Sequence, residues 1–375
     1  MKKIQIATLT IAFVLVAVAF ISIPVAANPD TRWDTLSAYM RDNYDDPSVN
    51  GEGGYHLPGT EASRLFPTVG AAHVYYEMGQ FDYRPPVVDL VKMKNFTRKL
   101  QWKSGGEDFD RYGGFSLFIA GPVSMKNSYY AVKLWKLLTN PDYDDIPGIN
   151  NLDELNGTSG LIYVNKTQST EGGFGSNENE APDIVSTFYA LYVMEYMLEI
   201  SGEAKETWLW NETATLEFIQ SCREGDAFKL SPTSNIASIT ATAAGLLALD
   251  ILGQVNVLTI EDRQNLLNWV GARQDADPSD GITGGFTESL LTNDTNLLST
   301  YHALEIYTLL GGVPSINMTA AARFIVDCQA ADGSWGTVPG LDEGTLFNAG
   351  LAFEALRMLD ISGTYIDMIY EEDPN

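Results

Sequence analysis

The sequence has little cysteine, histidine or positive charge. It holds 2 Cys and 3 His among 375 residues, so few residues are available for a disulfide framework or a thiolate and imidazole metal site. Lys and Arg number 23 against 49 Asp and Glu, which gives a formal net charge of −26. A surface this acidic repels polyanions. We therefore exclude nucleic acid as a partner and interpret the excess acid as an aid to solubility outside the cell.

Only one segment is apolar for long enough to cross a bilayer. Two lysines precede a largely apolar run over residues 4–23, and small residues ending at Ala27 follow it. This order is typical of a signal peptide that is cut after Ala27, but an uncleaved run of this length would serve as a membrane tether. Either alternative places the rest of the chain outside the cytoplasm, either secreted or anchored in the membrane. We expect residues 1–27 to be the signal peptide or anchor.

Six N-x-S/T sequons are compatible with glycosylation of an exported surface. The motif is short, so it supports export without establishing it. The sequons begin at Asn95, Asn156, Asn165, Asn211, Asn293 and Asn317.

A pattern with an aromatic residue at its start and Gln or Arg at its end recurs five times. Residues four apart share one face of a helix, so each copy predicts the last turns of a helix with a polar residue near its end. The copies are FTRKLQ from Phe96, YVNKTQ from Tyr163, FIQSCR from Phe218, WVGARQ from Trp269 and FIVDCQ from Phe324.

A small residue followed by an aromatic one comes after each copy, and a further instance precedes the first copy. We call these six pairs the anchors. Their spacing is 49 to 60 residues, and we interpret each as a structural wedge, because a small residue lets the backbone pass close to a neighbour while the ring fills the gap. The anchor aromatics are Tyr55, Phe115, Phe174, Phe228, Phe286 and Trp335.

A helix that is apolar nearly all round follows each anchor. Such helices must be buried on every side, so they predict an inner layer, with the more amphipathic helices outside it. Most of them are followed by glycine, at Gly79, Gly202, Gly253, Gly311 and Gly363, as a left-handed C-cap requires, and the second stops before Asn140 and Pro141. The expected inner helices span residues 67–78, 126–138, 184–197, 236–252, 297–310 and 346–359.

Six helix pairs without polar capping repeats favour a closed ring over an open solenoid, because an open array would need polar ends. The predicted fold is therefore all-α: one α/α toroid of six helical hairpins with inner and outer helix rings, over residues 28–375. An open superhelix is the alternative. In the ring, Cys222 and Cys328 occupy equivalent places a third of a turn apart, beyond the reach of a disulfide. We expect two buried free thiols.

The repeats resemble those of protein prenyltransferase β subunits and terpene cyclases. The strings FIVDCQAADGSWG around Cys328 and QSTEGGFG around Gly173, each followed by an apolar helix, carry this resemblance, which extends from about Leu36 to Ile361. It implies the six-hairpin α/α toroid of that family. It does not by itself fix a function, since one architecture hosts many activities.

The zinc site of the protein prenyltransferases is not retained. In GGFGSNENEAPDIVSTF, Asp183 matches the family's aspartate, but Val185 stands where the resemblance places the thiolate ligand. Residues 176–180 read SNENE where the family has basic residues for the diphosphate, and these glutamates would repel it. The family's histidine aligns near Leu298 rather than His302. We expect no metal and no other cofactor.

A run of acidic residues and the three histidines are interpreted as structural features. Residues 142–145 read DYDD, which matches the Asp-x-Asp-Asp acid of class II terpene cyclases, but they follow Pro141 in a loop between repeats, where no apolar cavity would raise an aspartate's pKa. We interpret them as a solvated loop. His302 is interpreted as a packed core histidine, and His56 and His73 have no partner at metal spacing.

No catalytic residue is assigned from the sequence. Carboxylates such as Glu171, Asp183, Glu288 and Asp294 lie near the anchors, which means little in a chain with 49 acids. Several side chains on the expected inner helices are candidates to line a central cavity, although core packing explains most of them. These candidates are Tyr129, Tyr130, Phe188, Tyr189, Tyr192, Tyr301, His302 and Tyr307.

The leading functional prediction is an exported prenyltransferase-like toroid without zinc chemistry, which binds an apolar small molecule or a protein in or around its cavity. The alternative is an enzyme: a divergent prenyltransferase or terpene cyclase that acts on isoprenoids, or a glycan-active lyase or hydrolase.

Overall fold

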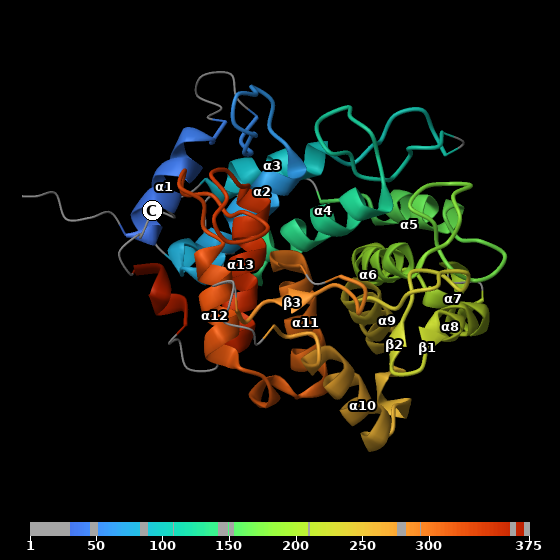
Figure 1. Cartoon of the computed structure of the whole chain (residues 1–375). Helices are drawn as coiled ribbons and strands as arrows, with labels where there is room; N and C mark the ends of the chain where they lie inside the picture. Colours follow the sequence, from blue (N-terminus) through green and yellow to red (C-terminus); the bar gives the residue numbers. More distant parts are fainter. Residues whose placement is uncertain are drawn as a thin grey trace, which may run out of the picture.

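The chain forms two concentric sets of α-helices (Figure 1). The computed structural model describes residues 31–45, 52–82, 89–107, 109–141, 149, 154–208, 211–275, 283–292, 294–360 and 365–370. The inner helices are α2 (Leu65–Glu77), α4 (Met125–Leu138), α6 (Ile184–Ser201), α9 (Ile239–Ile251), α11 (Leu297–Leu310) and α13 (Leu346–Leu359). The outer helices are α1 (Arg32–Asp42), α3 (Leu90–Lys99), α5 (Gly157–Lys166), α8 (Glu212–Ser221), α10 (Ile260–Gly271) and α12 (Met318–Asp327).

Short elements connect these helices. They are the one-turn helix α7 (Lys205–Trp208), the 3-10 turns η2 (Gln80–Asp82), η5 (Val255–Val257), η6 (Val313–Ser315) and η7 (Ile366–Tyr370), and two antiparallel ribbons. In the ribbons, β1 (Arg223–Glu224) pairs with β2 (Ala227–Phe228), and β3 (Phe286–Thr287) pairs with β4 (Thr295–Asn296). No helix among the described residues has the length and apolar character that a membrane span needs.

Five of the six inner helices begin with the same side-chain cap. The side chain of the N-cap residue accepts a hydrogen bond from the backbone N–H three residues later, which satisfies one of the free donors of the first turn. Helix α2 is the exception, because Arg64 at its N-cap makes no such bond. The capping residues are Ser124, Asp183, Ser238, Asn296 and Thr345.

The inner helices run parallel, with their N-terminal ends on one rim. The first backbone N–H of an inner helix donates to a carbonyl in the anchor loop of the next repeat, as between Leu65 and Leu117 O at 2.8 Å and between Ile184 and Leu230 O at 2.9 Å. Met125, Ile239 and Leu297 repeat this bond. Each outer helix therefore returns the chain to the same rim.

Glycine ends four of the inner helices, as predicted. Gly202 and Gly311 are C-caps with φ of 69° and 74°, in the left-handed region that favours glycine. Gly79 and Gly253 have φ of 64° and 69° one residue after the C-caps of α2 and α9. Gly363 lies outside the described residues.

The anchors are structural wedges. All six anchor rings are buried, and the backbone N–H of Phe174 donates to Thr187 Oγ1 of α6 at 3.0 Å. The same bond to an inner-helix hydroxyl recurs at Tyr55, Phe115, Phe228 and Phe286. Five of the six anchors are thereby fixed against the first turn of their own inner helix.

The recurring glutamine joins one outer helix to the next. Gln101 Nε2 donates to Asn156 O at 2.9 Å, and Asn156 N donates back to Gln101 Oε1 at 2.8 Å. Gln274 and Asn317 repeat this reciprocal pair. Gln329 Nε2 instead donates to Arg32 O at 2.8 Å, which connects the last repeat to α1. The glutamines therefore close the outer ring.

Two glycines close the inner ring. Helices α2 and α13, near the opposite ends of the chain, lie side by side (Figure 1). A Cβ on Gly70 would come within 1.9 Å of Leu346 O, and a Cβ on Gly350 would come within 2.6 Å of Gly70 Cα. The two backbones pack so closely that only glycine fits. The predicted α/α toroid is thus confirmed, and the open superhelix is wrong.

Several residues singled out in the sequence have structural places. Asn156, Asn211 and Asn317 are N-caps of outer helices, while Asn95 and Asn165 lie within α3 and α5. Their glycosylation stays a prediction, and Asn293 lies outside the described residues. Cys222 and Cys328 are buried free thiols, as expected, and burial raises the pKa of Cys222 to about 11.

Candidate functional site

The centre of the toroid holds a cavity of about 460 Å³. Five of the inner helices line it. Wall residues in the first half of these helices, such as Tyr129 and Tyr301, are buried, whereas Glu195, Asp250 and Thr308, nearer the C-terminal ends, are exposed. The cavity therefore opens at the C-terminal ends of the inner helices. Its wall consists of Tyr129, Lys133, Phe188, Tyr192, Glu195, Leu247, Asp250, Ile251, Tyr301, Glu305, Thr308, Leu309, Glu354 and Met358.

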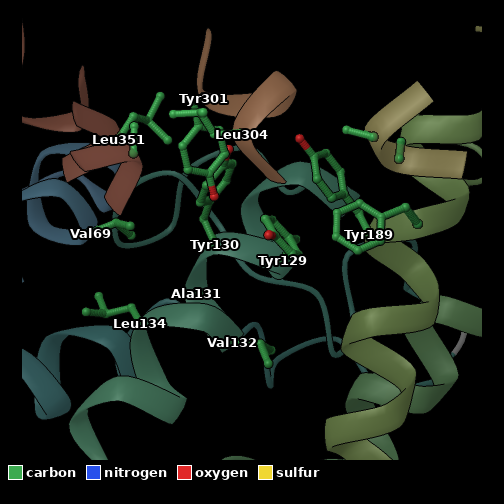
Figure 2. Close-up of a cluster of buried hydrophobic side chains, with 14 of the residues drawn as sticks. Val69, Tyr129, Tyr130, Ala131, Val132, Leu134, Tyr189, Tyr301, Leu304 and Leu351 are labelled. Atoms are coloured by element: carbon green, nitrogen blue, oxygen red, sulfur yellow. The ribbon is translucent and has the colours of Figure 1, made fainter. Parts of the chain in front are cut away.

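Aromatic rings form the floor of the cavity. Tyr129, Phe188 and Tyr301 each stand five residues after the N-cap of their own helix, so they occupy one level of the ring. The ring centroids of Tyr129 and Phe188 are 5.3 Å apart. Figure 2 shows the neighbouring Tyr130 and Tyr189 rings beside this floor. Such packing gives a rigid apolar base.

Charged side chains occupy the next level, one helical turn further. His73, Lys133, Glu305 and Glu354 each stand nine residues after the N-caps of α2, α4, α11 and α13. Because each helix is apolar nearly all round, a charge repeated at one level marks a position that faces the axis of the ring.

Glu354 is the hub of this level. Its carboxylate accepts hydrogen bonds from Lys133 Nζ at 2.6 Å and Tyr301 OH at 3.0 Å, and it lies 2.9 Å from His73 Nδ1. Burial alone would raise the pKa of Glu354, but the charges of His73 and Lys133 and their hydrogen bonds outweigh it and hold that pKa well below its ordinary value. Glu354 is therefore ionised at neutral pH.

Glu305 faces the same cavity from α11. Its Oε2 lies 2.6 Å from Nδ1 of His302, one turn earlier on the same helix. The side chains of both residues are about one-seventh exposed, at 15% and 14%. His302 does not line the cavity. It holds in position the carboxylate of Glu305, which does.

Two carboxylates mark the mouth. Glu195 and Asp250 stand twelve residues after the N-caps of α6 and α9, one level beyond the hub, and both are exposed. Within the described part of the chain neither carboxylate has a cationic partner at ion-pair distance, in contrast to Glu354. Lys136 and Arg357 stand at the same level on α4 and α13 but do not line the cavity, so the negative charge belongs to the lining of the mouth alone.

The sequence matches the family described as prenyltransferase alpha-alpha toroid domain over residues 5–212 and 178–372, which is most of its length. The chain belongs to this family. The resemblance inferred from the repeats is thereby confirmed.

Among curated proteins, the toroid is similar to the geranylgeranyl transferase type-1 subunit beta of Arabidopsis thaliana. The two are 24% identical over 129 residues, which is 34% of this chain and 31% of that protein. The match thus spans about a third of the relative's length.

Solved structures share the fold at low identity. Candida albicans protein geranylgeranyltransferase-I, complexed with GGPP, has a TM-score of 0.62 and 14% identity over 90% of this chain and 98% of that one. The Scytonema type II terpene cyclase MstE, in complex with geranylgeranyl dihydroxybenzoate, has a TM-score of 0.51 and 10% identity over 88% and 96%. A protein from Actinoplanes has a TM-score of 0.53 and 14% identity over 88% and 98%. At such identities the likeness shows the fold alone.

The residues at the family's zinc position do not fit the metal. Both carboxylate oxygens of Asp183 are engaged at the N-terminus of α6, where Oδ1 accepts from Ser186 N at 2.8 Å and Oδ2 from Ser186 Oγ at 2.7 Å. Val185, two residues after this cap, offers no ligand atom. In the described ranges no group of three or more His, Cys, Asp or Glu side chains is arranged to hold a metal ion.

The structure divides the eight candidate cavity residues of this toroid into two groups. Tyr129, Phe188, Tyr192 and Tyr301 line the cavity. Tyr130 and Tyr189 pack behind the floor, and His302 contacts Glu305. Tyr307 points outward, where its hydroxyl donates to Leu267 O of α10 at 2.9 Å. The DYDD segment, residues 142–145, lies outside the described residues.

The charged wall residues were missed in the sequence. Each of Lys133, Glu195, Asp250, Glu305 and Glu354 is one of few charged residues in a mostly apolar helix, which was the signal available. The loop carboxylates that were considered instead include Glu288, whose Oε2 accepts bonds from Thr240 Oγ1 and Ser299 Oγ, so it joins α9 to α11. Glu171 and Asp294 are exposed and lie apart from the wall.

Proposed function

We propose that this toroid binds an apolar small molecule in its central cavity and does not transfer isoprenoids from a diphosphate with zinc. The single observation that supports this most is a cavity of about 460 Å³ with an aromatic floor, which is within the size range of small-molecule sites. The Candida transferase and the Scytonema cyclase are complexed with geranylgeranyl compounds, so isoprenoid chains are suitable probes.

Two features argue against the enzymatic alternatives. A prenyl diphosphate would meet Glu195 and Asp250 at the mouth, where like charges repel. A class II cyclase needs a neutral carboxyl group that protonates an alkene, and the lowered pKa keeps Glu354, the most buried carboxyl on the wall, ionised. Binding without these reactions agrees better with the wall as it stands.

Titration of the purified full chain with farnesol, an uncharged isoprenoid, tests the proposal. We expect saturable binding by calorimetry. Leu247→Trp should weaken it at least about tenfold, because Leu247 lines the cavity and the indole would fill part of it. Ile260→Trp, on the exposed surface of α10, is the matched control and should bind as the native chain does.

Three outcomes would contradict the proposal. Absence of farnesol binding would show that the cavity does not bind an uncharged isoprenoid. Binding that Leu247→Trp leaves unchanged would place the ligand elsewhere. Zinc-dependent turnover of farnesyl diphosphate would establish the transferase alternative instead.

We also infer that the toroid is exported. The support is the apolar run over residues 4–23, preceded by two lysines and followed by small residues up to Ala27. Fractionation of the producing cells, with N-terminal sequencing of the product, tests this inference. A chain that begins at Asn28 outside the cytoplasm is expected for a cleaved signal, and an intact chain in the membrane for an anchor. An intact chain in the cytosol would refute export.

A further inference from the structure

We infer that the cavity selects a cationic amphiphile, meaning a molecule with an apolar body and a protonated amine or quaternary ammonium head. This inference rests on the proposed function and names the chemical class of its ligand. Four of the wall residues are acidic, Glu195, Asp250, Glu305 and Glu354, against one basic residue, Lys133. The wall therefore has a formal charge of −3.

The single cation on the wall is already paired. Lys133 Nζ lies 2.6 Å from Glu354, so this pair leaves no net charge for a ligand. Glu305 contacts His302, which does not itself line the cavity. Glu195 and Asp250 have no such partner in the described part of the chain, and they stand on neighbouring inner helices at the mouth. The attraction for a ligand cation is thus greatest at the mouth.

The backbone adds to this potential. The inner helices run parallel, and the cavity opens at their C-terminal ends, where helix dipoles place partial negative charge. Side-chain carboxylates and helix ends therefore act in the same direction at the mouth. An anionic head group would oppose both.

Aromatic faces supply the third element. Tyr192 stands between the floor and the mouth, on the same helix as Glu195. Lys136 Nζ already lies 5.0 Å from its ring centroid, so a ligand ammonium group must displace this side chain to contact the ring. Tyrosine rings attract ammonium groups within about 6 Å. The geometry thus favours a ligand with its apolar body on the floor of Tyr129, Phe188 and Tyr301 and its ammonium head at the level of Glu195 and Asp250.

Three probes that share one tail and differ in head charge test the inference. Farnesylamine is a cation at neutral pH, farnesol is uncharged, and farnesyl diphosphate is an anion. For the full chain at low ionic strength, we expect the amine to bind at least about tenfold more tightly than the alcohol, and the diphosphate most weakly. Added salt should reduce the preference for the amine.

A double variant isolates the two mouth carboxylates. Glu195→Gln with Asp250→Asn should reduce the preference for the amine over the alcohol to within about threefold, because the ammonium head loses both counter-charges at the mouth. The matched control, Glu217→Gln with Glu261→Gln, changes the net charge equally on exposed positions of the outer helices α8 and α10. It should leave the preference intact.

The outcomes separate this inference from the proposed function. Equal binding of farnesol and farnesylamine, or tightest binding of the diphosphate, would refute the cationic ligand and leave the apolar cavity standing. A preference that the control pair removes as fully as the mouth pair would also refute it, since net charge alone would then explain the result. Failure of farnesol to bind would overturn the proposed function itself.

Discussion

The carboxylate of Glu354 on α13 accepts a hydrogen bond from Lys133 Nζ on α4 at 2.6 Å, although α2 lies between these helices in the ring. His73 of α2 contacts the same carboxylate at 2.9 Å. One acidic side chain therefore joins three inner helices where the last repeat meets the first two. The charge network both shapes the cavity wall and connects the two ends of the chain.

Glu354→Gln should destabilise the fold by about 3–5 kcal/mol, because it leaves the ammonium group of Lys133 buried without its counter-charge. Urea unfolding at pH 7 measures the change. The double variant Lys133→Met with Glu354→Met should cost less than the sum of the two single variants, since neither partner is then left alone. Additive costs would show that the pair contributes no coupling. Glu217→Gln on the exposed face of α8 is the control and should change stability little.

The raised pKa of Glu77 predicts that the folded chain loses stability as the pH rises. Burial, with the charge of Glu354 adding to it, raises the pKa of Glu77 from 4.5 to about 7. Between these values the folded chain keeps a proton that the unfolded chain has released, so the free energy of unfolding falls with increasing pH. The contribution of Glu77 is complete below pH 4.5 and is lost through about pH 7, at a cost of about 2–3 kcal/mol.

Urea unfolding of the native chain and of Glu77→Gln between pH 5 and 8 would measure this effect. This interval contains the raised pKa of Glu77. Other carboxyl groups titrate in both proteins, so the difference between the two curves isolates Glu77. The variant should gain stability relative to the native chain as the pH rises. A difference that is constant over this interval would show that Glu77 titrates near its ordinary pKa.

The ring of helices was predictable because its signals are local and repeated. Helices α11 and α13 have the expected bounds, since an apolar run with a polar cap before it specifies both where a helix starts and which layer it joins. Helix α6 extends to Ser201, beyond the expected Met197, because the chain does not reach its left-handed glycine until Gly202. Hairpin count and closure followed from this repetition.

The composition of the cavity wall was not predictable in the same way. Nothing local distinguishes a charged wall residue from other charges on the same helix, such as Lys136 on α4 or Arg357 on α13, and the hub joins side chains of different repeats. Lys133 and Glu354 are 221 residues apart in sequence, so no local pattern pairs them. Aromatic residues were considered first because they are frequent, yet Tyr307 shows that an inner-helix ring can equally face the outer layer. The number of residues from the N-cap to a side chain distinguishes positions that face the cavity from positions that face the outer helices.

Gly70→Ala should disrupt the closure of the ring. Alanine normally favours a helix over glycine by about 1 kcal/mol, but here its Cβ would lie 1.9 Å from Leu346 O of α13. The helices must separate, so we expect a loss above about 4 kcal/mol or failure to fold. Gly106→Ala is the control: its Cβ meets no atom within 4 Å, and only its φ of 76° is unfavourable. Equal stability loss in the two variants, measured by thermal unfolding, would refute tight closure.

Asp183 distinguishes a capping role from the metal-binding role that its match to the family suggests. The equivalent positions in other repeats carry Ser124, Ser238, Asn296 and Thr345, all of which cap their helices. Asp183→Ser should therefore keep most of the stability, whereas Asp183→Ala should cost about 1 kcal/mol, because the N–H of Ser186 loses its acceptor. Unfolding measurements give these differences, and titration of each protein with zinc gives an independent readout. If the native chain binds zinc stoichiometrically and Asp183→Ser abolishes that binding at unchanged stability, then Asp183 is a ligand and the capping explanation is insufficient.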